Sequence, residues 1–152
     1  PETFDAWLSR NSNKKSTLKD WFASLGEQVV EVRVEGEARY LLAEHEDELA
    51  ATQPSRATHL LGAFDQFVLG PGTKDTHMLA NKHRSRVSKA AGWIAPVLTQ
   101  GGRITGVWEM DDGNLVVTPF PGEQAPPSKV LEDAAARLAA VHGLVKVTPR
   151  TG

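Results

Sequence analysis

The sequence lacks cysteine altogether, so disulfide bonds and thiolate metal sites are excluded among its 152 residues. It lacks an apolar run of about 18 residues, the minimum for a transmembrane helix, and it does not open with the basic and apolar regions of a signal peptide. A cytoplasmic protein without membrane contact is therefore expected. The net charge is only −2, so binding to nucleic acid cannot rest on the overall charge.

Motifs for metals and cofactors are equally scarce. His45 is followed by Glu46, but the second histidine of a zinc-protease motif is absent, and residues 70–74 lack the spacing of a phosphate-binding loop. Neither a dinucleotide fingerprint nor a nucleophile elbow occurs in the sequence. We therefore expect no metal site and no cofactor.

Residues 1–51 combine two kinds of periodicity. Helical spacing of apolar residues predicts one helix over residues 1–10 and a second helix that is capped by the hydroxyl of Thr17. Strand-like alternation over residues 30–42, with Gly36 at the turn, predicts a β-hairpin with one buried face. Helix, helix and hairpin in this order are typical of a winged helix, in which the second helix enters the major groove of DNA and the hairpin is the wing.

The start of the chain bears on its completeness. The first residue is Pro1 rather than methionine, and apolar residues at helical spacing follow at once. Proline favours the first position of a helix, so the residue that would cap this helix precedes the chain. We therefore expect the chain to be the C-terminal portion of a longer protein, with part of the winged helix outside it.

A second, β-rich domain is predicted over residues 59–152, after a linker over residues 52–58. A basic helix is expected over residues 81–91, and a C-terminal helix is expected to begin at Ser128. The expected strands are antiparallel and cover Trp93–Thr99, Arg103–Met110 and Asn114–Phe120, with a last strand at Leu144–Thr148. The predicted fold class is α+β: a partial winged helix followed by a small, antiparallel, barrel-like domain.

The second half also carries a family resemblance. Residues 59–70 read HLLGAFDQFVLG, and residues 82–108 contain KHRSRVSKAAGWIAPV and GGRITGVW. These blocks resemble bacterial winged-helix DNA-binding proteins related to the glycosylases that unhook DNA interstrand crosslinks. The resemblance implies tandem winged helices followed by a small β-rich domain, with double-stranded DNA and upstream winged-helix domains as partners.

The resemblance does not bring a catalytic motif with it. Glycosylases of that family are thought to position a water molecule with a Gln-x-Gln or Gln-x-Asp motif near the N-terminal part of the protein. The glutamines of this chain are Gln28, Gln53, Gln66, Gln100 and Gln124, and none is followed two residues later by Gln or Asp. We therefore assign no catalytic residue within these 152 residues.

The positive charge is concentrated in residues 74–89, which hold five basic residues against Asp75. Such a segment is expected to contact DNA phosphates. The candidate contact residues are Lys82, His83, Arg84, Arg86 and Lys89. Alternatively, the segment is a solvated helix face, or an arginine of this set forms an internal ion pair with Asp65.

A smaller basic set lies at the N-terminal end of the second predicted helix: Lys14, Lys15 and Lys19. These lysines are expected to contact phosphate, unless the winged helix serves as a packing or dimerisation unit. Asp65 lies in an apolar stretch, where it is either a catalytic carboxylate or a structural group in an ion pair or turn cap. Trp93 and Trp108 either stack on an unpaired base or pack in the core.

Three functions are compatible with these patterns. The first is a DNA-binding module that contacts the phosphate backbone through the basic helix. The second is the DNA-clamping part of a repair glycosylase that acts on alkylated or crosslinked bases, with its catalytic motif upstream. The third is a structural or interaction domain without DNA binding. The oligomeric state is left open.

Overall fold

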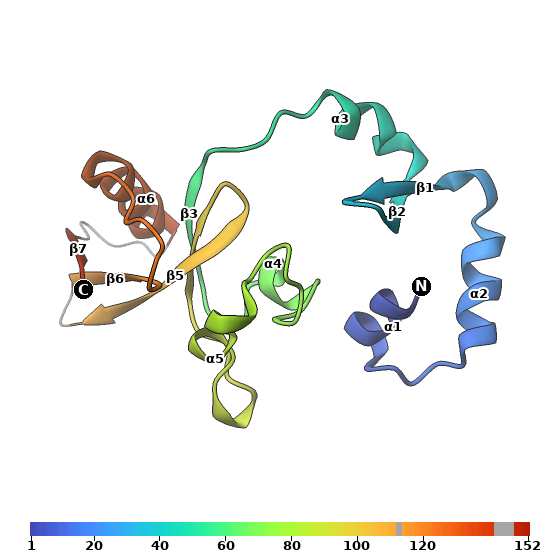
Figure 1. Ribbon diagram of the computed structural model, residues 1–152, viewed down its shortest axis with the longest axis horizontal. Coiled ribbons are helices and arrows are strands. Elements are labelled where there is room, and N and C mark those ends of the chain that lie inside the picture. Colours follow the sequence, from blue (N-terminus) through green and yellow to red (C-terminus); the bar gives the residue numbers. More distant parts are fainter. Residues whose placement is uncertain (112–113, 142–147) are drawn as a thin grey trace. The chain divides into compact units, whose positions relative to one another are not determined.

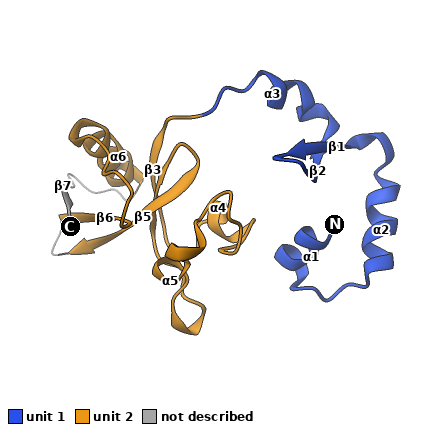
Figure 2. Ribbon diagram, in the orientation of Figure 1, with its two compact units in different colours: residues 1–54 blue, residues 55–152 orange. Residues whose placement is uncertain are grey.

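The computed structural model describes residues 1–111, 114–141 and 148–152, and the chain divides into two compact units (Figures 1 and 2). Unit 1 covers residues 1–54 and unit 2 covers residues 55–152. Both units contain helices together with antiparallel strand pairs, so the expected mixture of α and β structure is confirmed. None of the described helices is long and apolar enough to cross a membrane.

Unit 1 consists of helices, a hairpin and short 3-10 turns. Its elements are α1 (Glu2–Ser9), α2 (Lys15–Ser24), the antiparallel pair β1 (Val29–Val34) and β2 (Glu37–Leu42), and α3 (Glu46–Ala51) (Figure 1). The hairpin turns at Glu35 and Gly36, which both have positive φ. The prediction that Thr17 caps the second helix is wrong, because the chain already enters the helix at Lys15, after an extended Lys14.

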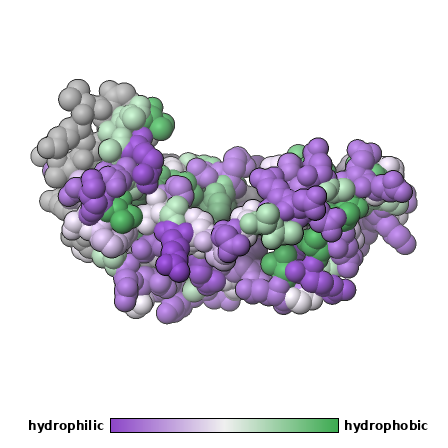
Figure 3. All heavy atoms as spheres, turned by 90° about the horizontal axis from the view of Figure 1, so that it is seen from above, coloured by the Kyte–Doolittle hydropathy of each residue, from purple (hydrophilic) through white to green (hydrophobic). Residues whose placement is uncertain are grey.

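Unit 1 leaves most of its apolar side chains exposed. Within residues 1–54, all of which the structure describes, only Asp5 and Leu18 are buried. Tyr40 and Leu42, expected on the buried face of the hairpin, are each about half exposed, so that prediction is wrong. Hydrophobic residues accordingly reach the surface on the right of the view in Figure 3, where unit 1 lies. The physical reason is that two short helices and a two-stranded hairpin cover too little of one another.

Unit 2 is built on a five-stranded sheet. Its strands pair in sequence order: β3 (Thr58–Leu61), β4 (Val97–Gln100), β5 (Arg103–Asp111), β6 (Asn114–Pro119) and β7 (Thr148–Thr151). The first three pairings are antiparallel, but β6 and β7 run parallel, so the all-antiparallel prediction is wrong for the last pair. In the described residues, β3 and β7 are the sheet edges, which differs from a closed barrel. Most of the strand predicted at Leu144–Thr148 lies outside the described residues.

Both faces of the sheet are covered. Successive side chains of a strand point to opposite faces, and in β4 Leu98 joins one apolar cluster while Val97 joins the other. Helix α6 (Ser128–Val141), whose start at Ser128 the sequence predicted, packs on the first face through Leu131 and Ala135. The irregular segment between β3 and β4, with α4 (Gln66–Leu69) and α5 (Arg84–Val87), covers the second face (Figure 1).

The continuous basic helix predicted over residues 81–91 is not formed. A 3-10 turn at Asn81–His83 leads into the single turn of α5, and the chain leaves the helical region at Ser88. The reason is tertiary: the Ala95 N–H donates to the Val87 carbonyl, and Ser88 pairs with Ile94. These contacts fold residues 88–94 back as a loop, so the positive charge lies on a short turn and a loop rather than along one helix.

Candidate nucleic-acid interface

The predicted basic contact residues of unit 2 differ in how exposed they are. Lys82, Arg86 and Lys89 are exposed, whereas Arg84 is partly buried and its Nε donates to the Thr73 hydroxyl at 3.3 Å. Lys82, Arg86 and Lys89 have no ion-pair or side-chain hydrogen-bond partner among the described residues. These three cations can therefore bind an external anion without first breaking an internal contact.

His83, a predicted contact residue, does not lie on this surface. Its side chain is only 4% exposed, and its ring stacks on Phe120 with 4.5 Å between ring centroids. Burial lowers the pKa of His83 below its ordinary value; Lys82 and Arg86 lower it further, while Glu123 opposes them. The buried Nε2 has no hydrogen-bond partner in the described part of the chain. His83 is thus a neutral core residue of unit 2.

Asp65 has a structural position. Its carboxylate accepts a hydrogen bond of 2.8 Å from the Phe67 N–H and caps the first turn of α4. No ion pair joins it to Arg84 or Arg86, all three of which the structure describes. Of the alternatives that the sequence left open, this geometry matches the turn cap.

The loop after α5 presents an aromatic ring to solvent. The Lys89 N–H donates to the Trp93 carbonyl at 2.8 Å, and the Trp93 N–H donates to the Ala90 carbonyl at 3.2 Å. Ala91 and Gly92 complete the loop in the left-handed region of φ. The Trp93 side chain is 51% exposed and meets Phe64 edge to face, with 5.0 Å between centroids.

The second tryptophan of unit 2 is buried instead. Trp108 lies in the apolar cluster under α6, and its Nε1 donates to the Leu61 carbonyl at 2.9 Å. Of the two roles that the sequence left open, core packing therefore describes Trp108. Trp93 is the tryptophan of unit 2 that an external group can reach.

Arg86, Lys89 and Trp93 share one cavity of about 410 Å³, which we call the basic–aromatic pocket. Its remaining wall comes from the loop before β4 and from β5 and β6: Ala95, Pro96, Val107, Trp108, Glu109, Met110 and Thr118. Glu109 is the acidic residue of the wall and offsets part of the positive charge. Two unpaired cations beside an exposed indole can bind an anionic group that carries a flat ring.

The lysines of unit 1 differ in whether they have an ion-pair partner. Lys15 forms an ion pair of 2.8 Å with Glu2, whereas Lys14 and Lys19 are exposed without a partner in the described residues. The Glu2 carboxylate raises the pKa of Lys15 by hydrogen bonding and charge. Lys14 and Lys19 are thus the freer candidates for phosphate contact at the start of α2.

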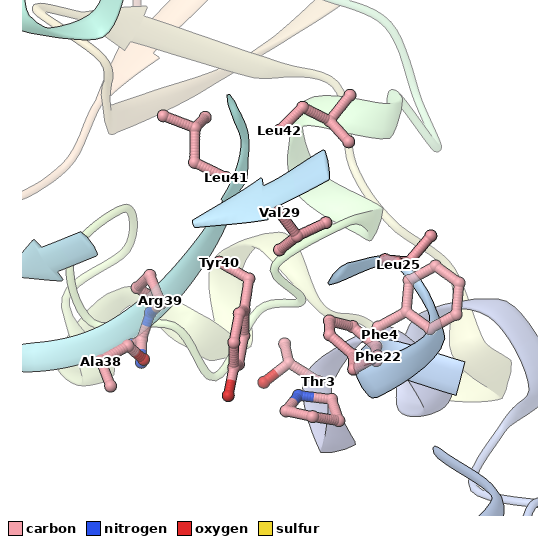
Figure 4. Close-up of a pocket in the computed structure, with 11 residues that line it drawn as sticks. Thr3, Phe4, Phe22, Leu25, Val29, Ala38, Arg39, Tyr40, Leu41 and Leu42 are labelled. Carbon is pink, nitrogen blue, oxygen red and sulfur yellow. The ribbon is translucent and has the colours of Figure 1, made fainter. Parts of the chain in front are cut away.

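Unit 1 also carries an apolar groove of about 410 Å³, which we define by Phe4, Phe22, Leu25, Val29, Tyr40 and Leu42 (Figure 4). The rings of Phe4 and Phe22, and those of Phe22 and Tyr40, meet edge to face at 5.9 and 5.1 Å. Arg39 is the charged residue in its lining, and its guanidinium pairs with Glu37. The groove is therefore suited to an apolar partner and not to phosphate.

Sequence reasoning overlooked one polar cluster of unit 1. The buried Asp5 carboxylate accepts hydrogen bonds from the Ser9 hydroxyl and, at 2.6 Å, from the Asn13 side chain. These bonds lower the pKa of Asp5, with Ser9 as the larger cause. They tie α1 to the turn before α2. The spacing of Asp, Ser and Asn at every fourth residue was the available signal.

Comparisons with known proteins agree over nearly the whole chain. Residues 2–141 match the family described as "DNA glycosylase AlkZ-like". A relative from Streptomyces sahachiroi, named "Interstrand DNA cross-link repair glycosylase", is 52% identical over 149 residues, which cover 98% of this chain and 40% of the relative. The solved structure of "Streptomyces sahachiroi DNA glycosylase AlkZ" superposes with a TM-score of 0.96 at 51% identity and covers 99% of this chain. The chain spans 41% of that structure's length.

Proposed function

The chain belongs to the DNA glycosylase AlkZ-like family, and we propose that it supplies a DNA-contacting surface of a DNA-repair glycosylase. The observation that carries this proposal is the basic–aromatic pocket, where Arg86 and Lys89 lie unpaired beside an exposed Trp93. The relatives favour this function over a DNA-binding module unconnected with repair. By the name of the Streptomyces relative, the substrate we propose is double-stranded DNA with interstrand crosslinks.

Arg86 and Lys89 act by binding phosphates of the DNA backbone. An arginine fork binds a phosphate with two parallel hydrogen bonds, and a lysine contributes a point charge. Each phosphate neutralised releases counterions, so binding weakens as salt increases. This role replaces the predicted basic helix with a pair of cations on a short turn and a loop.

The test is a duplex-binding titration at several salt concentrations, with the Arg86→Gln/Lys89→Gln double variant. We expect the slope of log affinity against log salt to shrink by about 0.9 for each phosphate that the variant no longer neutralises. The matched control is Lys129→Gln, which removes an exposed cation from α6 on the other face of the sheet. Equal salt slopes for the original chain and the double variant would contradict the assignment of these cations.

For unit 1 we propose the winged-helix role, with α2 as the recognition helix and β1–β2 as the wing. The order of the elements and the free Lys14 and Lys19 at the start of α2 support this assignment. The apolar groove is the site at which we propose that a partner helix packs. This helix belongs to the part of the longer relatives that this chain does not match. A winged helix needs a closed apolar core, and unit 1 buries only Leu18 among its apolar residues.

This packing role can be tested by mixing the chain with the unmatched part of the Streptomyces glycosylase as a separate polypeptide. We expect the two to co-elute, and we expect Tyr40→Asp to abolish co-elution because it places a charge in the groove. Val34→Asp is the matched control, since Val34 lies on the same hairpin, is similarly exposed and does not line the groove. Self-association of the chain in place of this complex would contradict the proposal.

A further inference from the structure

Aromatic residues of unit 2 differ sharply in burial. Phe120 and Trp108 are buried in the two apolar clusters, whereas Trp93 and Phe64 are 51% and 42% exposed. An exposed tryptophan keeps a large apolar surface in water at a cost that core packing would remove. The exposed pair therefore calls for an explanation that the packing of unit 2 does not provide.

The backbone holds this pair in place. Two backbone hydrogen bonds close the loop that presents Trp93, and Ala91 within it has a φ of 54°. Phe64 has a φ of 59°, although it carries a bulky side chain. Non-glycine residues in this region are strained, and such strain is concentrated at binding and catalytic sites. The backbone at Trp93 is thus held in place, and the Phe64 ring contacts the indole edge to face.

Charge and apolar surface are divided within the pocket. Arg86 and Lys89 supply the cations, while Trp93, Val107 and Met110 supply apolar contact. A nucleotide shows the same division, because its phosphate is anionic and its base has a flat apolar face. A base inside a duplex has both faces covered by its neighbours, so only a base that has left the stack can offer its face to an indole.

We propose that Trp93 stacks on an unpaired, extrahelical base of duplex DNA, while Arg86 and Lys89 hold the phosphate beside that base. This proposal rests on the proposed DNA contact and specifies the form of DNA that the pocket takes: a duplex with a locally unstacked nucleotide. Phe64 supports the indole from its edge. Glu109 lies on the pocket wall, and its negative charge repels a second phosphate there.

The experiment compares two labelled duplexes of one sequence, one fully paired and one with a single unpaired base. The full 152-residue chain, Trp93→Ala, Trp93→Phe and the control Trp7→Ala are titrated against both by fluorescence anisotropy. Trp7 is a matched control because it is also about half exposed, but it lies in α1 of unit 1, outside the proposed recognition helix and wing. Thermal unfolding checks that each variant is folded. Trp93→Phe retains an aromatic ring and keeps the comparison possible if Trp93→Ala does not fold.

We expect the chain to prefer the duplex with the unpaired base, and Trp93→Ala to weaken that binding about tenfold, the effect of removing one stacked base. Binding to the fully paired duplex should stay unchanged, Trp93→Phe should recover most of the loss, and Trp7→Ala should change neither affinity. Equal affinity of the original chain for both duplexes, or an equal loss on both in Trp93→Ala, would overturn the stacking proposal while the proposed DNA contact stands. Failure to bind either duplex would overturn both.

Discussion

The two units of this chain differ in how far they bury their apolar residues. Unit 2 places a sheet between two layers and buries residues such as Leu98 on one face and Phe120 on the other. Unit 1 leaves Trp7, Trp21 and Tyr40 about half exposed. The difference indicates that unit 2 contains the covering layers that its own core needs, whereas unit 1 buries only Leu18 and the hydrogen-bonded Asp5.

The largest contrast is expected from truncating one phenylalanine in each unit. Phe120→Ala opens the core of unit 2, where Phe120 is 2% exposed and stacked on His83, and should cost about 3–5 kcal/mol. Phe4→Ala in unit 1 removes a ring that is 39% exposed and should cost less than about 1 kcal/mol. Urea unfolding followed by circular dichroism measures both, and equal losses would erase the distinction between the units.

A smaller contrast is expected at two glycines. In unit 2, a Cβ on Gly106 would lie 2.7 Å from the Thr118 carbonyl oxygen and 3.0 Å from the Pro119 Cα, so strand β6 must shift. Gly106→Ala should therefore cost about 1–3 kcal/mol. Gly36→Ala, in the hairpin of unit 1, meets open space, and only its positive φ opposes it, at about 1 kcal/mol. Thermal unfolding of both variants checks this order, which a larger loss at Gly36 would reverse.

Acid should weaken the two units in different pH ranges. The pKa of His83 is lowered from 6.5, so the unfolded chain takes up this proton first, and the stability contributed by neutral His83 falls as the pH drops below 6.5. The pKa of Asp5 is lowered from 3.8, so its contribution is complete above 3.8 and is lost as the pH falls below that value. Unit 2 should therefore begin to lose stability at a higher pH than unit 1.

The melting temperature between about pH 8 and pH 3 measures this order. His83→Gln is the control, because an amide does not titrate and the loss just below the ordinary histidine pKa should disappear. A pH profile in that range that His83→Gln leaves unchanged would remove His83 from the explanation.

The smallest effect on stability is expected from removing an exposed ion pair, and this effect should be the same in both units. Lys15 and Glu2 in unit 1, and Lys129 and Asp133 in unit 2, lie 2.8 and 3.1 Å apart with largely exposed side chains. Water and salt screen such pairs, so Lys15→Ala and Lys129→Ala should leave the melting temperature unchanged. A clear drop in one unit alone would show that its pair belongs to a wider network.

Local patterns in the sequence were sufficient for several elements. The cap at Ser128 and the helical periodicity after it predicted α6, and alternation around Gly36 predicted the hairpin of unit 1. The same rules failed at residues 81–91, where basic and small residues read as one helix. Contacts of Val87 with Ala95 and of Ser88 with Ile94, between residues six to eight positions apart, ended that helix, and helix periodicity does not report such contacts.

The sequence by itself determined the family blocks, the concentration of positive charge in residues 74–89 and elements with clear local periodicity, such as the hairpin of unit 1, because these depend on neighbours along the chain. Only the tertiary structure decided which charged and aromatic residues remain accessible. It buried His83 against Phe120, used Asp65 as a cap and left Arg86, Lys89 and Trp93 around one pocket. Burial depends on which segments pack together across the sheet, and that information is spread over the whole of unit 2.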